Sequence, residues 1–182
     1  MIKLKEIEIL FSERVISDRV IDLGQQISQD LQKKGITQII VLGILKGSFI
    51  FMADLVRQLK VPSVHCEFLG VSSYGDATKS SGEVKITHDL TRAIKDHDLL
   101  LVEDIADTGL TLSYLQKTLF ARGAKSIHTA VFLTKPEKII NQCKLDYVGF
   151  DIGPEFVVGY GLDAGGEFRN LPFVGKIPTV VK

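Results

Sequence analysis

The sequence of 182 residues is poor in cysteine: it has only Cys66 and Cys143, which lie 77 positions apart with no C-x-x-C pair. This scarcity excludes a disulfide scaffold and a thiolate zinc site, and it is typical of proteins kept in a reducing compartment. The four histidines, at positions 65, 88, 97 and 128, lack metal-ligand spacing, so we expect structural or surface roles for them. We therefore expect a cytoplasmic protein.

The sequence also lacks a charge excess, with 22 Lys and Arg against 22 Asp and Glu. No general field then draws in nucleic acid or an anionic membrane, and we expect neither as a partner. The longest mainly apolar run, residues 39–52, has 14 residues and contains Lys46, which is too short and too charged to span a bilayer. The first ten residues lack the apolar core of a signal peptide, so we expect a soluble, unexported protein.

What is present is an alternation of helices and strands. Apolar residues three and four apart predict an amphipathic helix over 17–34. Continuous apolar runs predict buried strands at 37–45, 65–71, 98–105 and 128–134, and helical spacing predicts helices at 49–59 and 110–123. This order is typical of an α/β fold with a doubly wound, mainly parallel sheet flanked by helices.

Two segments depart from that alternation. Residues 72–83 are polar and punctuated by glycine, which predicts a long mobile loop between two strands. Residues 149–175 contain 7 of the 16 glycines, interleaved with aromatic residues, which predicts turns and short strands beside a flat ligand. No linker divides the chain, so we expect a single domain over residues 1–182.

The most informative segment is 99–112, where an apolar strand leads into Glu103, Asp104 and Asp107 and then into Thr-Gly-Leu-Thr at 108–111. In a parallel sheet, ligands bind beyond the carboxyl ends of the strands, and a helix N-terminus there binds phosphate. No lysine follows the glycine, which excludes a nucleoside-triphosphate loop. Carboxylates beside a phosphate fit sugar hydroxyls or Mg²⁺, which indicates a phosphorylated ribose. The alternative is a solvated acidic cluster in which Asp107 or Thr108 caps a helix.

The segment VEDIADTGLTL resembles the phosphoribosyl-diphosphate signature of the type I phosphoribosyltransferases. Further segments in the same order narrow the resemblance to the hypoxanthine-guanine phosphoribosyltransferase family: GILKGSFIFMADL (43–55), SSYGD (72–76), FLTKP (132–136), and FVVGYGLD with FRNLP (156–172). The matches run from about residue 8 to residue 177. The resemblance implies the type I fold, with a small hood made by residues 1–12 and 149–182, and a homodimer or homotetramer. It also implies Mg²⁺-dependent transfer of the phosphoribosyl group to N9 of hypoxanthine and guanine.

The resemblance further implies roles on the sugar side. Glu103 and Asp104 would hold the ribose hydroxyls and help to bind Mg²⁺, and Lys46, Gly47 and Arg169 would contact the diphosphate. It leaves open whether the Leu45–Lys46 peptide bond is cis. Taken alone, Lys46 is typical of a lysine that reaches solvent from a strand end. The 5'-phosphate would be wrapped by Asp107, Thr108, Gly109, Leu110 and Thr111.

On the purine side, the resemblance makes Asp107 the general base or acid at N7, a role that a carboxylate near a developing cation can fill. Lys135 would donate to the purine O6, for which the amino group of adenine is no substitute. Phe156 would stack on the base, although alone it is more typical of a core residue, and the Val157 backbone would read the base edge. Asp163 would be a direct Mg²⁺ ligand. The loop around Ser73 and Tyr74 would close as a lid.

Two other functions are compatible with parts of the sequence. A regulatory nucleic-acid-binding protein could keep this fold as a nucleotide sensor, but it would need a basic face. A phosphoacceptor signalling domain would suit an aspartate cluster at a strand end, but it would not explain Lys135, Phe156 or the pair of Asp163 and Arg169. Residues 164–166 (Ala-Gly-Gly) are smaller than is usual in the family and bear on base preference.

Overall fold

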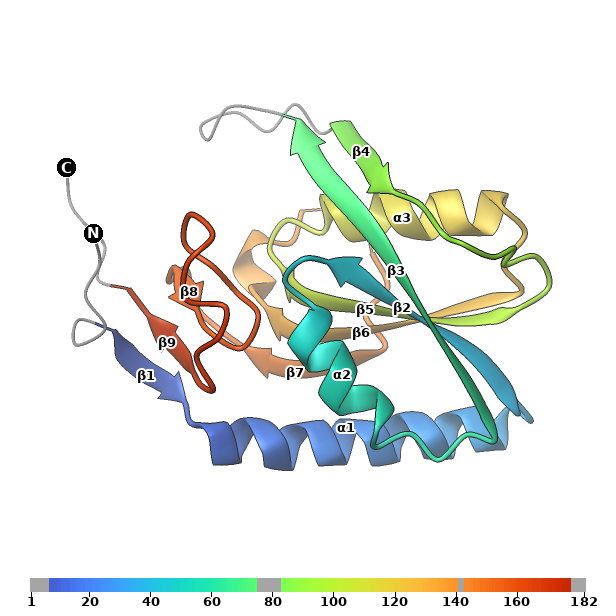
Figure 1. Cartoon of the computed structure of the whole chain (residues 1–182), viewed down its shortest axis with the longest axis horizontal. Coiled ribbons are helices and arrows are strands. Elements are labelled where there is room, and N and C mark those ends of the chain that lie inside the picture. Colours follow the sequence, from blue (N-terminus) through green and yellow to red (C-terminus); the bar gives the residue numbers. More distant parts are fainter. Residues whose placement is uncertain (1–6, 75–82, 141–142, 178–182) are drawn as a thin grey trace.

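The computed structural model describes residues 7–74, 83–140 and 143–177, and its main feature is a six-stranded sheet. The strand order is β4-β3-β2-β5-β6-β7, and every neighbouring pair is parallel except β3 with β4 (Figure 1). The strands are β2 (Gln38–Leu45), β3 (Ser63–Tyr74), β4 (Glu83–His88), β5 (Asp98–Ala106), β6 (Ser126–Thr134) and β7 (Tyr147–Asp151). The predicted mainly parallel sheet is confirmed.

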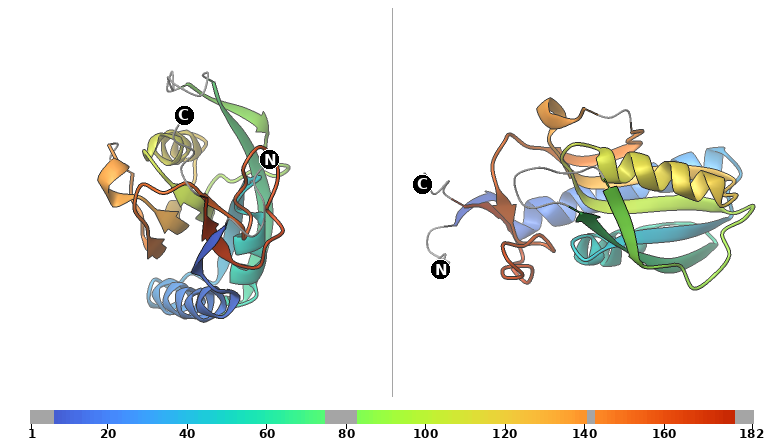
Figure 2. Two further views of the ribbon diagram at one scale, coloured as in Figure 1. Left: turned by 90° about the vertical axis from the view of Figure 1, so that its left-hand side faces the viewer. Right: turned by 90° about the horizontal axis from the view of Figure 1, so that it is seen from above.

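Helices cover both faces of this sheet (Figure 2). Helices α1 (Glu13–Lys33) and α2 (Phe49–Val56) lie on one face, and α3 (Leu110–Ala121) lies on the other. Successive strand residues point to opposite faces, so Val41 packs with α1 and α2 while Leu42 packs with α3. The predicted doubly wound arrangement is confirmed. None of the described helices is long and apolar enough to cross a membrane.

Two helix boundaries differ from the prediction. Helix α1 begins at Glu13 rather than near residue 17, because the Ser12 side chain caps it by accepting a hydrogen bond from the Val15 N–H at 3.4 Å. The buried Ile16 extends the apolar stripe into this first turn. Helix α2 ends at Val56 rather than at residue 59, where a tighter turn follows through the Gln58 N–H to the Leu55 carbonyl.

The predicted loop at 72–83 is too long. Strand β3 continues to Tyr74 and β4 begins at Glu83, which is the antiparallel partner of Tyr74. Polar residues can extend a strand at a sheet edge because the ladder uses backbone groups, which the side-chain pattern does not show. The remainder of that loop, 75–82, lies outside the described residues.

A second, antiparallel sheet has the order β1-β9-β8 and joins the two ends of the described chain (Figure 1). Its strands are β1 (Glu8–Phe11), β8 (Val157–Val158) and β9 (Val174–Lys176). The predicted hood boundary at residue 149 is wrong, because residues 149–151 belong to β7 in the main sheet. Phe11 stacks on Phe150 with ring centroids 4.2 Å apart and thereby connects the small sheet to the large one.

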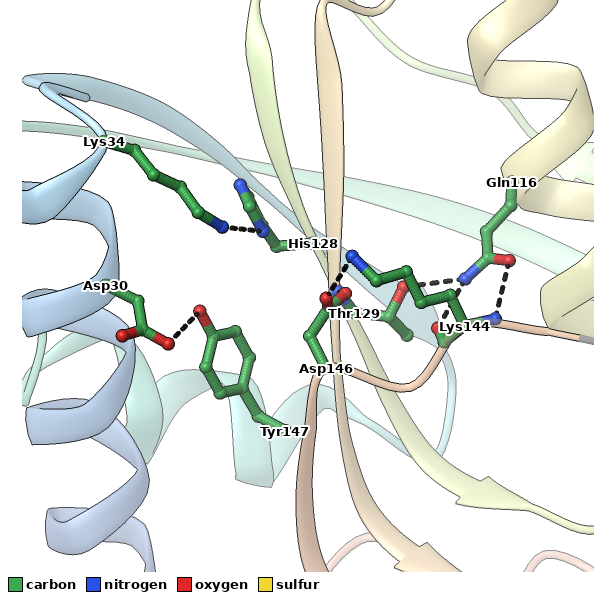
Figure 3. Close-up of polar contacts among 8 residues, drawn as sticks. All are labelled: Asp30, Lys34, Gln116, His128, Thr129, Lys144, Asp146 and Tyr147. Carbon is green, nitrogen blue, oxygen red and sulfur yellow. Dashed lines mark hydrogen bonds and ion pairs between the residues drawn. The ribbon is translucent and has the colours of Figure 1, made fainter.

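A polar network lies at the amino end of β6, the edge opposite to the predicted site (Figure 3). The Tyr147 hydroxyl donates to Asp30 at 3.3 Å, and the Lys34 ammonium contacts Nδ1 of His128 at 3.4 Å. These contacts tie the end of α1 to β6 and β7. Four further residues extend the network to α3: Gln116, Thr129, Lys144 and Asp146.

We expect His128 to make the stability of the fold pH-dependent. Burial, reinforced by the Lys34 cation, lowers the pKa of His128 below its ordinary value. The unfolded chain therefore takes up this proton first, so the stability that the neutral ring contributes is present above about pH 6.5 and is lost as the pH falls. In urea unfolding from about pH 7.5 to about pH 5.5, the wild type should lose stability more steeply than His128→Gln. Parallel pH dependences would contradict this role.

Candidate active site

The carboxyl ends of β2, β5 and β6 bring the predicted site residues to one edge of the sheet. Lys46 and Gly47 follow β2, Asp107 follows β5, and Lys135 follows β6. Strands β5 and β6 end in register, with Ala106 opposite Thr134. The Lys135 N–H donates to the Ala106 carbonyl at 3.0 Å. The residues after these two strands therefore begin at the same level.

A small pocket of about 90 Å³ lies at the start of α3. It is lined by Glu103 and by residues 105–112. Gly109 adopts a positive φ of 77° immediately before the first helical residue, Leu110. The first N–H groups of a helix have no acceptor within the helix, so this end of α3 offers donors and a favourable dipole to an anion. The predicted phosphate loop thus has the geometry of an anion cradle.

An adjoining pocket of about 320 Å³ brings together six of the predicted residues: Asp104, Asp107, Lys135, Phe156, Val157 and Asp163. Phe156 is 58% exposed, so its ring is free to contact a ligand and is not a core residue. Four lining residues were not predicted: Ile105, Lys138, Pro154 and Leu162. The three apolar residues belong to no motif that would mark them as site residues. Lys138 is the last residue of the short helix η2 (Pro136–Lys138), three positions after Lys135, and this spacing could have pointed to a place in the site.

Lys135 is held in a fixed orientation at the wall of this pocket. Its side chain is buried, and its ammonium donates to the Glu155 carbonyl at 2.8 Å. Burial lowers the pKa of Lys135, while the nearby Asp107 carboxylate opposes that shift. A buried ammonium with one backbone acceptor can still donate to a ligand oxygen.

On the other side of the site, three segments make close contact through glycines. The Leu45–Lys46 peptide bond is cis, and Lys46 is exposed. A methyl group at Gly47 would lie 1.4 Å from Oδ2 of Asp104, and one at Gly161 would lie 2.0 Å from the Gly47 carbonyl oxygen. No side chain larger than hydrogen therefore fits at either glycine.

Arg169 connects this contact to Asp163. Its guanidinium donates to the Gly161 carbonyl at 2.6 Å and pairs with the Asp163 carboxylate at 2.5 Å. Gly161 therefore contacts both Gly47 and Arg169, two of the residues predicted to bind the diphosphate. These two residues and the third, Lys46, do not line the 320 Å³ pocket.

The acidic pair Glu103 and Asp104, near the end of β5, is partly buried. Burial, and then the neighbouring Asp104, raise the pKa of Glu103 well above its ordinary value. Burial also raises the pKa of Asp104. Hydrogen bonds from Glu103 and from the Ile105 N–H, the latter at 2.8 Å, oppose this rise. Oε2 of Glu103 has no partner among the described residues. A buried carboxyl oxygen without a partner fits a ligand that brings a hydroxyl donor or a cation.

The carboxylates do not form a metal cage of their own. Within residues 7–74, 83–140 and 143–177, no three His, Cys, Asp or Glu side chains are arranged to hold a metal ion. The ligand roles predicted for Glu103, Asp104 and Asp163 therefore stay predictions, and Asp163 also accepts the Gly166 N–H at 2.7 Å. Asp104 and Asp163 do face the same pocket, which fits Mg²⁺ held by one or two carboxylates together with substrate oxygens.

Ser73 and Tyr74 are the last residues of β3, and the placement of their side chains lies outside the described structure. Their role in a lid stays a prediction. A further pocket, of about 400 Å³, lies between α1, α2 and residues 170–172. It lies away from the strand ends and shares no lining residue with the two pockets above, so its size does not make it the site.

An α/β sheet with a phosphate cradle and a mixed-charge pocket at its strand ends is typical of proteins that bind phosphorylated sugars. Residues 7–164 match the model of the phosphoribosyl transferase domain, and the chain belongs to this family. The hypoxanthine-guanine phosphoribosyltransferase of Dictyostelium discoideum is 45% identical over 172 residues, 93% of this chain and 94% of that protein. The enzyme of the same name from Bacillus subtilis is 42% identical over 174 residues, 96% and 94% of the two chains.

The fold is also similar to that of a solved member of this family. A crystal structure of a hypoxanthine phosphoribosyltransferase from Staphylococcus aureus matches with a TM-score of 0.89 and 38% identity, covering 96% of this chain and 93% of that one. The resemblance found in the sequence and the type I fold that it implied are both confirmed.

The glycine contact yields a matched test. Gly161 and Gly166 have similar positive φ angles of 99° and 91°, but only Gly161 has a neighbour in the place of a methyl group. We expect Gly166→Ala to lower the free energy of unfolding by about 1 to 2 kcal/mol from backbone strain alone, and Gly161→Ala to lower it by at least about twice that. Urea unfolding of both variants measures the difference. Equal losses would contradict the close contact between Gly161 and Gly47.

Proposed function

We propose that this protein transfers the phosphoribosyl group of phosphoribosyl diphosphate to N9 of hypoxanthine and guanine, releasing diphosphate and the purine nucleoside monophosphate. One observation carries this function: the Lys135 ammonium and the Phe156 ring share a pocket with Asp107, and Asp107 also lines the phosphate cradle. The names of the relatives support the same reaction. None of them supports the regulatory nucleic-acid-binding alternative.

In the reaction, N9 attacks C1' of the ribose while the bond from C1' to the diphosphate oxygen breaks, and the electron pair leaves with the diphosphate. The proton on N7 passes to the Asp107 carboxylate. Asp107 suits this role because it lies where the base pocket meets the phosphate cradle, between the two ends of the forming nucleotide. The Lys135 ammonium donates to O6, and the Phe156 ring stacks on the base. The Val157 backbone reads the base edge.

The sugar and the leaving group are held by the other side of the site. Glu103 and Asp104 accept hydrogen bonds from the ribose hydroxyls, which would supply the partner that Oε2 of Glu103 lacks among the described residues. Lys46, Gly47 and Arg169 bind the diphosphate. Asp163 and Asp104 would hold Mg²⁺ together with substrate oxygens, and the bound ion would neutralise charge on the leaving diphosphate. Residues 107–111 hold the 5'-phosphate.

The direct test is incubation with hypoxanthine, phosphoribosyl diphosphate and Mg²⁺, with chromatographic detection of inosine monophosphate. Guanine and xanthine in parallel give the base preference. Absence of product with all three bases would refute the proposed function. A homodimer or homotetramer in the cytoplasm stays a prediction, and sedimentation analysis would measure the assembly.

Asp107→Asn keeps the size of the side chain but removes the proton acceptor. We expect kcat to fall roughly 10²- to 10⁴-fold, with little change in thermal midpoint because the side chain is half exposed. The matched control is Asp18→Asn, which changes an exposed aspartate on α1. A kcat within threefold of the control would exclude Asp107 as the base.

Lys135→Met tests how the site selects a 6-oxopurine. Loss of a charged hydrogen bond to O6 should lower kcat/KM for hypoxanthine roughly 10- to 100-fold. It should also lower the ratio of kcat/KM for hypoxanthine to kcat/KM for adenine, because adenine has no O6 to accept a hydrogen bond from this ammonium. Lys33→Met on α1 is the control. An equal loss for both bases, or no loss, would contradict the assignment.

A further inference from the structure

Lys138 lines the base pocket, yet none of the roles above uses it. Its ammonium lies 3.5 Å from Oδ1 of Asp107. We propose that Lys138 is a positioning residue, whose ammonium holds the Asp107 carboxylate in place to receive the purine N7 proton. This inference rests on the proposed function and assigns a residue that the sequence analysis did not single out.

The backbone fixes Lys138 relative to Asp107 from both sides. The Lys135 N–H donates to the Ala106 carbonyl at 3.0 Å, and the Ile140 N–H donates to the Thr108 carbonyl at 3.3 Å. The Lys138 N–H closes the turn of η2 on the Lys135 carbonyl at 2.9 Å. The segment that carries Lys138 is thus hydrogen-bonded to the residues immediately before and after Asp107. The ion pair is therefore set by the register of two connected loops, not only by two flexible side chains.

Among the charged side chains around Asp107, Lys138 is the one that forms a salt bridge with it in the described part of the chain. Lys135 lines the same pocket and its ammonium donates to the Glu155 carbonyl, but it makes no salt bridge to Asp107 within the described residues. The carboxylates of Asp104 and Asp163 also line this pocket, and the charge of Glu155 acts on Lys135. In the described part of the chain, Lys138 makes the one salt bridge to Asp107.

A partner of this kind suits a base that works from an exposed loop. Proton transfer needs the acceptor oxygen within hydrogen-bond reach of N7, and an unrestrained aspartate at a loop would sample several rotamers. The pair is partly exposed, with 44% of Lys138 and 50% of Asp107 accessible, so it is weak. When Asp107 accepts the N7 proton, its charge disappears and the pair loosens, while Lys138 keeps all of its own protons. After the nucleotide is released, Asp107 gives up the proton that it accepted from N7, and the ion pair with Lys138 forms again.

The test compares Lys138→Met, which keeps the apolar stem, with Lys138→Arg, which keeps the charge. Lys33→Met is the control for loss of an exposed lysine paired to aspartate. We expect Lys138→Met to lower kcat about 3- to 10-fold with both KM values within about twofold, and to move the acidic limb of the kcat profile to higher pH. Lys138→Arg should recover most of the activity. In the Asp107→Asn background, Lys138→Met should have no further effect.

The outcomes separate the two proposals. Absence of product with the wild type would overturn the proposed function and this role together. A wild type that forms product, combined with an unchanged kcat and pH profile in Lys138→Met, would overturn the role of Lys138 alone. A loss confined to KM for hypoxanthine would also overturn it, because Lys138 would then bind the base directly. Equal thermal midpoints for the three lysine variants would show that folding does not cause the differences.

Discussion

The parallel pairing of β5 with β6 is the constraint on which the site depends. These strands end in register at Ala106 and Thr134, and the Lys135 N–H continues the ladder onto the Ala106 carbonyl. Asp107 and Lys135 therefore leave the sheet side by side, although 28 positions separate them in the sequence. The backbone positions of the proposed base at N7 and the proposed donor to O6 are thus set by hydrogen bonds at the ends of these two strands.

Although the chain has no net charge, its candidate site contains both acidic and basic side chains. Lys135 is buried and Glu103 is partly buried, and burial lowers the pKa of Lys135 and raises that of Glu103, which favours the neutral form of each. Burying such groups costs free energy unless a partner meets them, and a ligand hydroxyl or cation would supply that partner for Oε2 of Glu103. Gly47 lets the Asp104 carboxylate lie against the backbone, and Gly161 does the same for the Gly47 carbonyl, because neither has a side chain.

The sequence was sufficient for the central strands, because continuous apolar runs mark strands buried on both faces. It was insufficient for β4 and β7, which are short edge strands whose pairing is made by the backbone and leaves little pattern in the side chains. Six predicted site residues share one pocket because the fold brings strand ends together. Ile105, Pro154 and Leu162 were not predicted because their places in the pocket follow from tertiary contacts and not from a motif, whereas Lys138 was overlooked although it lies three positions after Lys135. The Mg²⁺ roles of Glu103, Asp104 and Asp163 stay predictions, because an ion held largely by substrate oxygens needs few protein ligands.

The central claim is that one cleft at the strand ends holds the whole nucleotide. A crystal structure with inosine monophosphate tests it most directly. We expect the 5'-phosphate at residues 107–111, the base against Phe156, O6 beside the Lys135 ammonium and N7 beside Asp107. A nucleotide bound instead in the 400 Å³ pocket between α1 and α2, or a base turned with O6 away from Lys135, would contradict it.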